Sequence, residues 1–180
     1  MELIGRLLAR AVKVTTFLGM FAVAIMMLHI TADVIGKFMF NAPIPATIAL
    51  VSNYYMVVVA FLPIAFAETR NGHITVEVLT ELFPLRTQRH LYSWTYLLSA
   101  LIFGLLTFRS WGEARTTHEA GTFIMEQGTK IITWPSYYLL PIGAGLMTLV
   151  VIYRWLLYIS GAKSGLGEVP TLEKAAEYSD

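Results

Sequence analysis

Long apolar stretches without charged residues alternate with short polar segments along this chain. The four stretches are residues 14–32, 42–67, 91–108 and 131–153. An α-helix rises about 1.5 Å per residue and the hydrocarbon core of a bilayer is about 30 Å thick, so each stretch is long enough, or nearly so, to cross a membrane. The pattern predicts an all-α integral membrane protein with four transmembrane helices. The expected spans are about residues 14–36, 46–67, 90–111 and 132–157.

A shorter helical pattern lies in the polar segment between the second and third spans. Ile74, Val78 and Leu82 fall on one stripe of a helix, while Glu77 lies on the opposite side. A short helix with one apolar and one polar face lies in the plane of the membrane interface. We therefore expect an interfacial amphipathic helix over residues 74–83.

The remaining connections differ in kind. A tight outer turn that contains Asn41 and Pro43 joins the first two spans, and proline there stops one helix and starts the next. The longest outer loop is expected at roughly residues 112–130. Residues 1–160 form the predicted membrane domain, and residues 161–180 a polar cytoplasmic tail.

The distribution of basic residues predicts the orientation. If the N-terminus is cytoplasmic, the only basic residues outside, of the 13 in the chain, are Lys37, Arg109, Arg115 and Lys130. Because cytoplasmic loops carry the excess of Lys and Arg, the pattern favours an N-in, C-in topology. Aromatic residues mark the interfaces, and those expected at the outer one are Trp111, Trp134, Tyr137 and Tyr138.

Composition supports the membrane assignment. Hydrophobic residues make up 56% of the chain and charged residues only 14%, whereas about a quarter of the residues in soluble domains are charged. The chain has no cysteine, which excludes disulfides, a thiolate nucleophile and cysteine-based zinc or iron–sulfur sites. No soluble catalytic domain is visible, so we expect a protein that is not an enzyme, has no cofactor and does not bind nucleic acid.

The first span resembles a secretory signal in one respect. Arg6, Arg10 and Lys13 precede the apolar run, as in a positively charged n-region. The run is too long for the core of a signal peptide, and no small-x-small cleavage site follows it before Asp33. We expect this segment to be retained as a membrane helix.

Polar residues inside or at the edge of the spans are candidate functional residues, because ionisable groups are costly in a bilayer. They are His29, Asp33, Lys37, Ser52, Asn53, Arg109 and Glu113. His29, Asp33 and Lys37 share one helical face in the outer third of the first span. A cluster of Asp33 with Lys37 or Arg109 is expected, either as a structural ion-pair network near the headgroups or as a functional contact. No carboxylate follows Asp33 at greater depth, which disfavours a proton relay.

The histidines raise an alternative, a haem-binding membrane anchor of a respiratory complex. Two axial histidines must lie at one depth on facing helices. His29 and His90 are expected about 20 Å apart along the membrane normal, and His73 and His118 fall in connections. The positions disfavour haem. A second alternative is a small transporter that works alone as a homo-oligomer.

Three motifs resemble the small (Q) subunit of the tripartite ATP-independent periplasmic (TRAP) transporters. Residues 37–45, Lys-Phe-Met-Phe-Asn-Ala-Pro-Ile-Pro, are similar to that family's turn between the first two spans. Residues 72–79, Gly-His-Ile-Thr-Val-Glu-Val-Leu, and the following Leu-Phe-Pro are similar to its Gly-His-Ile-x-Val-Asp segment. Trp134-Pro135 and Pro141-Ile-Gly143 resemble its closing pattern. The match covers roughly residues 10–160.

Two departures from the family pattern concern the outer turn. Lys37 stands where the family often has Arg, so the charge is kept and the planar fork is lost. Ile48 and Ala49 stand where the family commonly carries an acidic pair. If that pair anchors a partner or a lipid headgroup, the contact must be made otherwise here, and Ser52, Asn53 and Asp33 are the candidates.

The resemblance implies a non-catalytic subunit of the bacterial inner membrane. In the family, a large M subunit carries the substrate and sodium sites and moves as an elevator, and a periplasmic binding protein delivers a carboxylate or sulfonate. The Q subunit packs among membrane lipids beside the scaffold of M and widens the fixed part of the transporter. Spans without charge suit that role, since a scaffold needs no aqueous path.

The resemblance and the residues together assign expected roles. We expect Asp33, Lys37 and Arg109 to form a polar contact between subunits, and the outer loop to touch the binding protein. Gly72 is expected to cap a turn and His73 to bond nearby backbone or Glu77. The residues expected to contact partners are Asp33, Lys37, Asn41, Pro43, Ser52, Asn53, Arg109, Glu113, Arg115, Glu119 and Glu126. The motif residues of the interfacial segment are Gly72, His73, Glu77, Val78 and Leu82.

Overall fold

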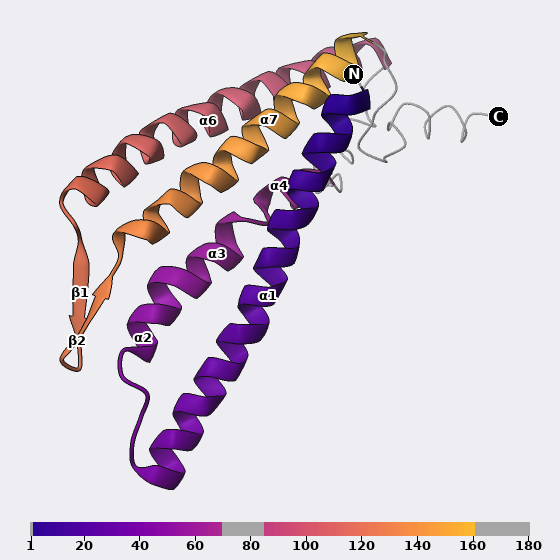
Figure 1. Cartoon of the computed structure of the whole chain (residues 1–180). Coiled ribbons are helices and arrows are strands. Elements are labelled where there is room, and N and C mark those ends of the chain that lie inside the picture. The colour runs from indigo at the N-terminus through magenta and orange to yellow at the C-terminus, as the bar shows by residue number, and fades with distance from the viewer. Residues whose placement is uncertain (1, 70–84, 161–180) are drawn as a thin grey trace.

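The computed structural model of the chain describes residues 2–69 and 85–160, and most of it is helical (Figure 1). The predicted interfacial helix at 74–83 lies outside the described residues, as do Gly72, His73, Glu77, Val78 and Leu82. The predicted tail, residues 161–180, lies outside them too.

In the described residues, four helical segments, here called passes, run up and down the molecule. The first pass is α1 (Glu2–Phe40). The second consists of α2 (Thr47–Leu50), a π-helical turn (Val51–Tyr55), α3 (Met56–Phe61) and α4 (Ile64–Thr69). The third is α6 (Leu85–Glu119), which leads into strands β1 (Phe123–Glu126) and β2 (Thr129–Ile132). A 3₁₀-helical turn (Trp134–Tyr138) then opens the fourth pass, α7 (Leu139–Ser160).

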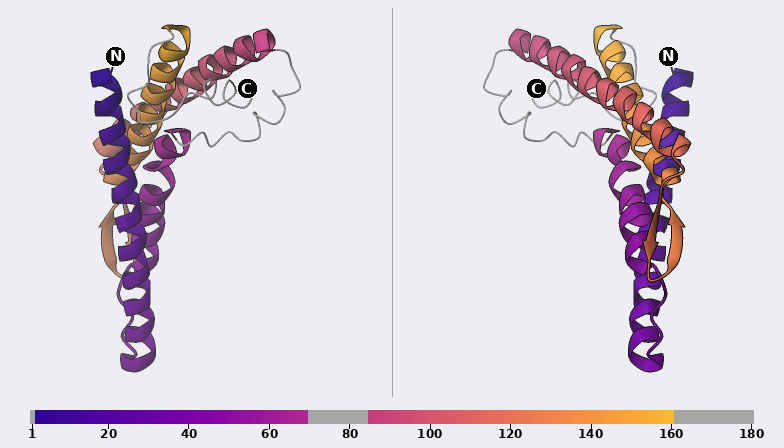
Figure 2. Two further views of the ribbon diagram at one scale, coloured as in Figure 1. Left: turned by 90° about the vertical axis from the view of Figure 1, so that its right-hand side faces the viewer. Right: turned by 90° about the vertical axis from the view of Figure 1, so that its left-hand side faces the viewer.

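The passes lie side by side in the order α6, α7, second pass, α1 (Figure 1). The beginning of α1 and the end of α7 lie at the same end of the molecule, which we call the terminal end, and the β-hairpin lies toward the opposite, hairpin end. In the edge-on views of Figure 2, α6 slants away from the other passes toward the terminal end. The arrangement is therefore open rather than a closed four-helix bundle.

Three helical segments are long and apolar enough to cross a membrane: Leu3–Phe40, Thr47–Thr69 and Trp134–Leu157. The remaining predicted span lies within α6, which is not among these three segments. The chain is mostly helical and has three helices that could cross a membrane, so the prediction of an all-α membrane protein is confirmed in part. A crossing by α6 and the N-in, C-in orientation remain predictions.

Two helices extend well beyond the expected spans. The first has 39 residues and is about 58 Å long, so the basic residues before the apolar run continue the same helix. The expectation of an outer loop over residues 112–130 is wrong, because α6 continues to Glu119 and a β-hairpin follows. Glu113, Ala114 and Arg115 are good helix formers, and the buried Ala114 packs against its neighbours. Gln127 and Gly128 have φ of 48° and 79°, as a two-residue hairpin turn requires.

The second pass is interrupted at Pro63. Proline has no backbone N–H, so α3 ends at Phe61 and the helix resumes at Ile64. The Pro63 carbonyl accepts hydrogen bonds from the N–H groups of Phe66 and Ala67, which restarts the helix. Gly19 on α1 leaves room for the proline ring, because a Cβ atom there would lie 2.9 Å from Pro63 Cγ.

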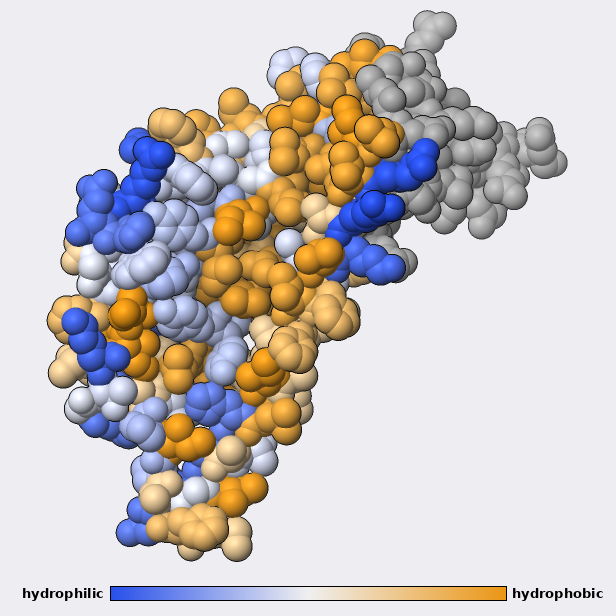
Figure 3. Space-filling model, in the orientation of Figure 1, coloured by the Kyte–Doolittle hydropathy of each residue, from blue (hydrophilic) through white to orange (hydrophobic). Residues whose placement is uncertain are grey.

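The principal core lies where α1, α4 and α7 meet, toward the terminal end. Its buried residues are Val12, Ala65, Met147, Val150 and Val151, and Tyr96, Ala100 and Phe103 of α6 pack against them. Most large apolar side chains lie outside it: Phe17 is 65% exposed, Leu28 71% and Phe38 81%. Figure 3 shows apolar side chains over much of the face that it presents. Such a surface requires lipid or a protein partner rather than water.

Candidate functional site

The outer turn folds back along the end of α1. Asn41 has φ of 51°, which reverses the chain after the helix. The Ala42 N–H then donates to the Gly36 carbonyl at 3.1 Å, and the Ile44 N–H donates to Asp33 Oδ1 at 2.6 Å. A Cβ atom at Gly36 would lie 2.8 Å from the Ala42 oxygen, so glycine permits this close return. Asp33 thus holds the turn that follows its own helix.

The β-hairpin packs against the start of the second pass. Residue Ala46 precedes α2 and provides no side-chain cap. Glu126 Oε2 instead accepts a hydrogen bond from the Ala49 N–H at 2.6 Å, and the Tyr54 hydroxyl donates to the Ile132 carbonyl at 2.5 Å. The first N–H groups of a helix lack partners within it, and a carboxylate there also interacts favourably with the helix dipole. A residue 77 positions away therefore caps this helix.

The π-helical turn carries the polar side chains of the second pass. Ser52 Oγ donates to the Ile48 carbonyl at 2.8 Å, and Asn53 Nδ2 donates to the Ala49 carbonyl at 2.9 Å. Both side chains therefore bond their own helix. In the same turn, Tyr55 places its hydroxyl 3.3 Å from His29 Nδ1, which links the second pass to α1. π-helical turns occur frequently at functional sites.

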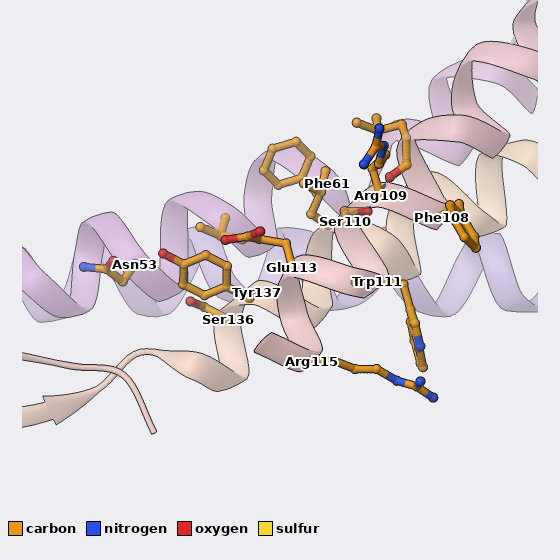
Figure 4. Close-up of a pocket in the computed structure, with 14 residues that line it drawn as sticks. Asn53, Phe61, Phe108, Arg109, Ser110, Trp111, Glu113, Arg115, Ser136 and Tyr137 are labelled. Atoms are coloured by element: carbon orange, nitrogen blue, oxygen red, sulfur yellow. Dashed lines mark hydrogen bonds between the residues drawn. The ribbon is translucent and has the colours of Figure 1, made fainter. Parts of the chain in front are cut away.

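A groove lies between the second pass and α6, and the start of α7 forms its floor (Figure 4). Its volume is about 870 Å³. Asn53 and Phe61 line one wall, and Arg109 and Glu113 line the other. Figure 4 shows Glu113 reaching from α6 toward the second pass, and Arg115 of the same helix also lines the groove. Within residues 2–69 and 85–160, no ion pair joins Arg109 to Glu113.

A buried ion pair lies near the terminal end. Arg154 Nη1 lies 3.5 Å from Glu68 Oε1, and Arg154 Nη2 donates to the Thr69 carbonyl at 3.0 Å. The side chains of Arg154 and Glu68 are 10% and 2% exposed. Sequence reasoning missed this pair, although one signal was present: Arg154 is a charged residue within the predicted fourth span, and Glu68 ends the second at the same side of the membrane.

An aromatic cluster joins the end of α6 to the start of α7. The His118 ring stacks on Trp134 with centroids 4.1 Å apart, and His118 Nδ1 lies 3.1 Å from the Tyr138 hydroxyl. The cluster fixes the base of the hairpin, since Thr133 also donates its N–H to the Thr122 carbonyl at 3.0 Å. In the described part of the chain, no three His, Asp or Glu residues lie close enough together to hold a metal ion.

A protein-family comparison decides the identity. The family model described as the DctQ component of the tripartite ATP-independent periplasmic transporters matches residues 26–160. The chain belongs to this family. The predicted resemblance to the small subunit of a TRAP transporter is thereby confirmed. A search of curated proteins found no match to the chain.

The start of α2, where Ile48 and Ala49 lie, receives a carboxylate from elsewhere in this DctQ component. The resemblance had implied an acidic pair at these two positions. Glu126 of the hairpin supplies the carboxylate through the bond to the Ala49 N–H. Of the charged residues expected to face a soluble partner, Glu126 is therefore used within the chain.

The expected cluster of Asp33 with Lys37 or Arg109 does not form. Neither basic residue makes an ion pair with Asp33 among the residues that the structure describes. The Asp33 carboxylate is engaged by the outer turn, and Arg109 lines the groove instead. The DctQ component brings Arg109, Glu113 and Asn53 to one groove, and Glu119 ends α6 close to the hairpin.

Proposed function

We propose that this DctQ component is the non-catalytic scaffold beside the large membrane subunit of a sodium-coupled secondary transporter. The transporter imports organic acids, carboxylates or sulfonates, that a periplasmic binding protein delivers. The complex lies in the bacterial inner membrane, where this subunit is a multi-pass component. Family membership supports the place of the chain in a TRAP transporter, and the following features support its proposed role there.

The observation that carries the proposal is the exposed apolar surface of α1. This helix is packed on one side by the second pass, while large side chains along its length remain exposed. They include Leu7, Phe17, Met20, Phe21, Met27, Leu28, Val34 and Phe38. Nothing in lipid drives apolar helices together except close packing and polar contacts, so a scaffold subunit needs a long, shape-specific face of this kind.

The placement of charged residues also supports a scaffold role rather than a transport pathway through this subunit. No Asp, Glu, Lys or Arg occurs in residues 14–32, 42–67, 91–108 or 131–153. A route for an organic anion and sodium through the membrane requires polar or charged lining along its depth. Three of the acidic residues near the ends of the predicted spans, Asp33, Glu68 and Glu126, make contacts within the chain.

The proposed partner contacts lie at the hairpin end. Toward the large subunit we assign Asp33, Lys37, Asn41, Pro43, Ser52, Asn53 and Arg109. Toward the periplasmic binding protein we assign Glu113, Arg115 and Glu119, with Glu126 acting through the position of the hairpin. The amphipathic segment 74–83 is proposed to brace the subunit in the inner leaflet through Val78 and Leu82.

Purification from the native gene neighbourhood tests the proposal. The tagged chain, extracted in mild detergent, is expected to bring down a much larger polytopic membrane protein in fixed stoichiometry. In proteoliposomes, uptake is expected only when the large subunit, this chain and the binding protein are combined under a sodium gradient. A pure homo-oligomer that transports alone, or redox subunits that carry haem, would overturn the proposal.

A further inference from the structure

The second pass covers one edge of the β-hairpin. The Ile131 side chain of β2 is buried against Ala46 and Ala49. The Ile132 carbonyl of the same strand accepts a hydrogen bond from the Tyr54 hydroxyl. The second pass therefore lies against β2, and β1 is the outer strand of the hairpin (Figure 1).

The register of the hairpin fixes which backbone groups of β1 point outward. Thr133 donates its N–H to the Thr122 carbonyl, so this pair is hydrogen-bonded. In an antiparallel ladder such pairs alternate with pairs that exchange no hydrogen bond. Ile124 lies in a pair of the first kind, and Phe123 and Met125 lie in pairs of the second kind. The N–H and C=O groups of Phe123 and Met125 therefore point away from β2.

These outward groups are available to another strand. In residues 2–69 and 85–160, no other segment forms a hydrogen bond with the backbone of Phe123 or Met125. The side chains of Phe123, Ile124 and Met125 are 49%, 40% and 61% exposed. Native edge strands usually carry a charged residue, a proline or a bulge that blocks further pairing. Residues 123–125 contain no charged residue and no proline, so nothing of this kind protects the edge of β1.

The level of the hairpin argues against lipid as the cover of this edge. The hairpin bonds to Ala49 and Tyr54, and both residues belong to Thr47–Thr69, a segment long and apolar enough to cross a membrane. Lipid tails offer neither donors nor acceptors of hydrogen bonds, and open sheet edges do not face them. A protein strand, in contrast, satisfies the outward groups of β1.

A second copy of this chain does not fit the edge. The strands run along the passes (Figure 1), and copies in one bilayer share one orientation, so the β1 strands of two copies are parallel. A two-fold axis along the membrane normal sets Phe123 and Met125 of both copies at equal heights. Parallel pairing requires the outward residues of one strand to lie between those of the other. The symmetric arrangement therefore leaves the outward groups unmatched.

We propose that an extended segment of the large membrane subunit adds to β1 as a third strand. The inference rests on the proposed function, which places that subunit beside this chain. The added strand bonds the N–H and C=O groups of Phe123 and Met125, and its apolar side chains pack against theirs. Addition of a strand to an exposed sheet edge is a general mode of recognition, and a two-stranded hairpin alone is only marginally stable.

The exposed side chains of β1 favour the large subunit over the periplasmic binding protein. Apolar interfaces are typical of permanent partners, whereas the surfaces of transient partners are more polar. A soluble binding protein must leave after it delivers its substrate. The edge of β1, with Phe123, Ile124 and Met125 exposed, has the character of a permanent contact.

Amide hydrogen exchange at single-residue resolution tests the proposal. The full chain is measured in nanodiscs alone, with the large subunit, and with the large subunit and the binding protein. On addition of the large subunit, exchange at Phe123 and Met125 is expected to slow about tenfold, because each amide gains a hydrogen bond. Exchange at Ile124, which bonds within the hairpin, is expected to be slow in all samples and reports that the hairpin is intact.

The alternative outcomes overturn the proposal in distinguishable ways. Unchanged exchange at Phe123 and Met125 in a stoichiometric complex would refute the added strand while leaving the proposed function intact. Slowing that requires the binding protein would assign the edge to that protein. Slowing that appears in the chain alone, and grows with its concentration, would assign the edge to a second copy. Failure of the large subunit to co-purify would refute the proposed function itself.

Proline substitutions separate the two edges of the hairpin. Met125→Pro removes an outward N–H without loss of a hydrogen bond to β2, and is expected to weaken binding of the large subunit by about tenfold. Met125→Ile keeps the N–H and is expected to bind normally. Ile132→Pro, the matched control, removes an outward N–H from the β2 edge and is expected to leave the affinity unchanged. Normal binding by Met125→Pro, with slow exchange retained at Ile124, would contradict the added strand.

Discussion

Replacing Gly143 by alanine tests the closest approach between the second pass and α7. An added Cβ atom would lie 2.1 Å from the Phe61 carbonyl oxygen and 2.8 Å from its carbonyl carbon. Both are backbone atoms, which cannot rotate away as a side-chain end could. The two helices must therefore separate, and the backbone before Pro63 must shift with them.

The magnitude follows from two opposing effects. Alanine favours a helix over glycine by about 1 kcal/mol, whereas forcing extra atoms into a packed contact costs about 1–3 kcal/mol and occasionally more. With both clashing atoms fixed in the backbone, we expect a net destabilisation of roughly 1–2 kcal/mol. Gly112→Ala is the matched control, since a Cβ atom there meets nothing within 4 Å. The control is expected to be neutral or to stabilise by up to about 1 kcal/mol.

Heating in detergent followed by size-exclusion chromatography measures the effect. For a chain of this size, 1 kcal/mol corresponds to roughly 2–4 °C in the melting temperature. Gly143→Ala should therefore melt several degrees below the unmodified chain, and Gly112→Ala at or above it. If both variants melted at or above the unmodified chain, α3 and α7 could not pack as closely as described here.

Three further substitutions test the contacts that join distant segments. Glu126→Ala removes the cap of α2 and should cost about 1 kcal/mol, with faster amide hydrogen exchange at Ala49; unchanged exchange there would refute the capping role. Glu68→Gln leaves Arg154 buried without its counter-charge and should lower the free energy of unfolding by about 3–5 kcal/mol. Replacing both residues, by Leu and Met, should cost less. A double variant that is equally or more destabilised would contradict the ion-pair assignment. Asp33→Ala leaves the Ile44 N–H of the outer turn without its charged acceptor and should lower the free energy of unfolding by about 1.5–3 kcal/mol. The same melting assay measures the effect, and an unchanged melting temperature would show that the turn holds without Asp33.

The apolar pattern alone was enough to predict the kind of protein and the location of its helices. A stretch of some twenty uncharged residues has few options other than a membrane helix, so three spans emerge where expected. The turn motif likewise predicted a reversal at Asn41, because proline and a short connection force one. The hydrogen bond from the Ile44 N–H to Asp33 was not predicted. Family membership was readable from motifs because these depend on residues close together in sequence.

The pattern misplaced the end of α6. Polar residues after Gly112 indicated a loop, but Glu113 and Arg115 favour helix whether or not lipid surrounds them. Helix ends depend on backbone hydrogen bonds and packing, such as the burial of Ala114, and polarity marks only the membrane boundary. The hairpin that follows was missed for the same reason.

Tertiary structure alone decided which polar groups meet. Glu126 reaches Ala49 across 77 positions, and Arg154 reaches Glu68 across 86. Hydrophobic periodicity reports which face of a helix is apolar, and carries no information about which helix lies beside it or at what height. The groove that holds Arg109 and Glu113 lies where α6 and the second pass flank the start of α7, and only the packing of these helices brings its lining residues together.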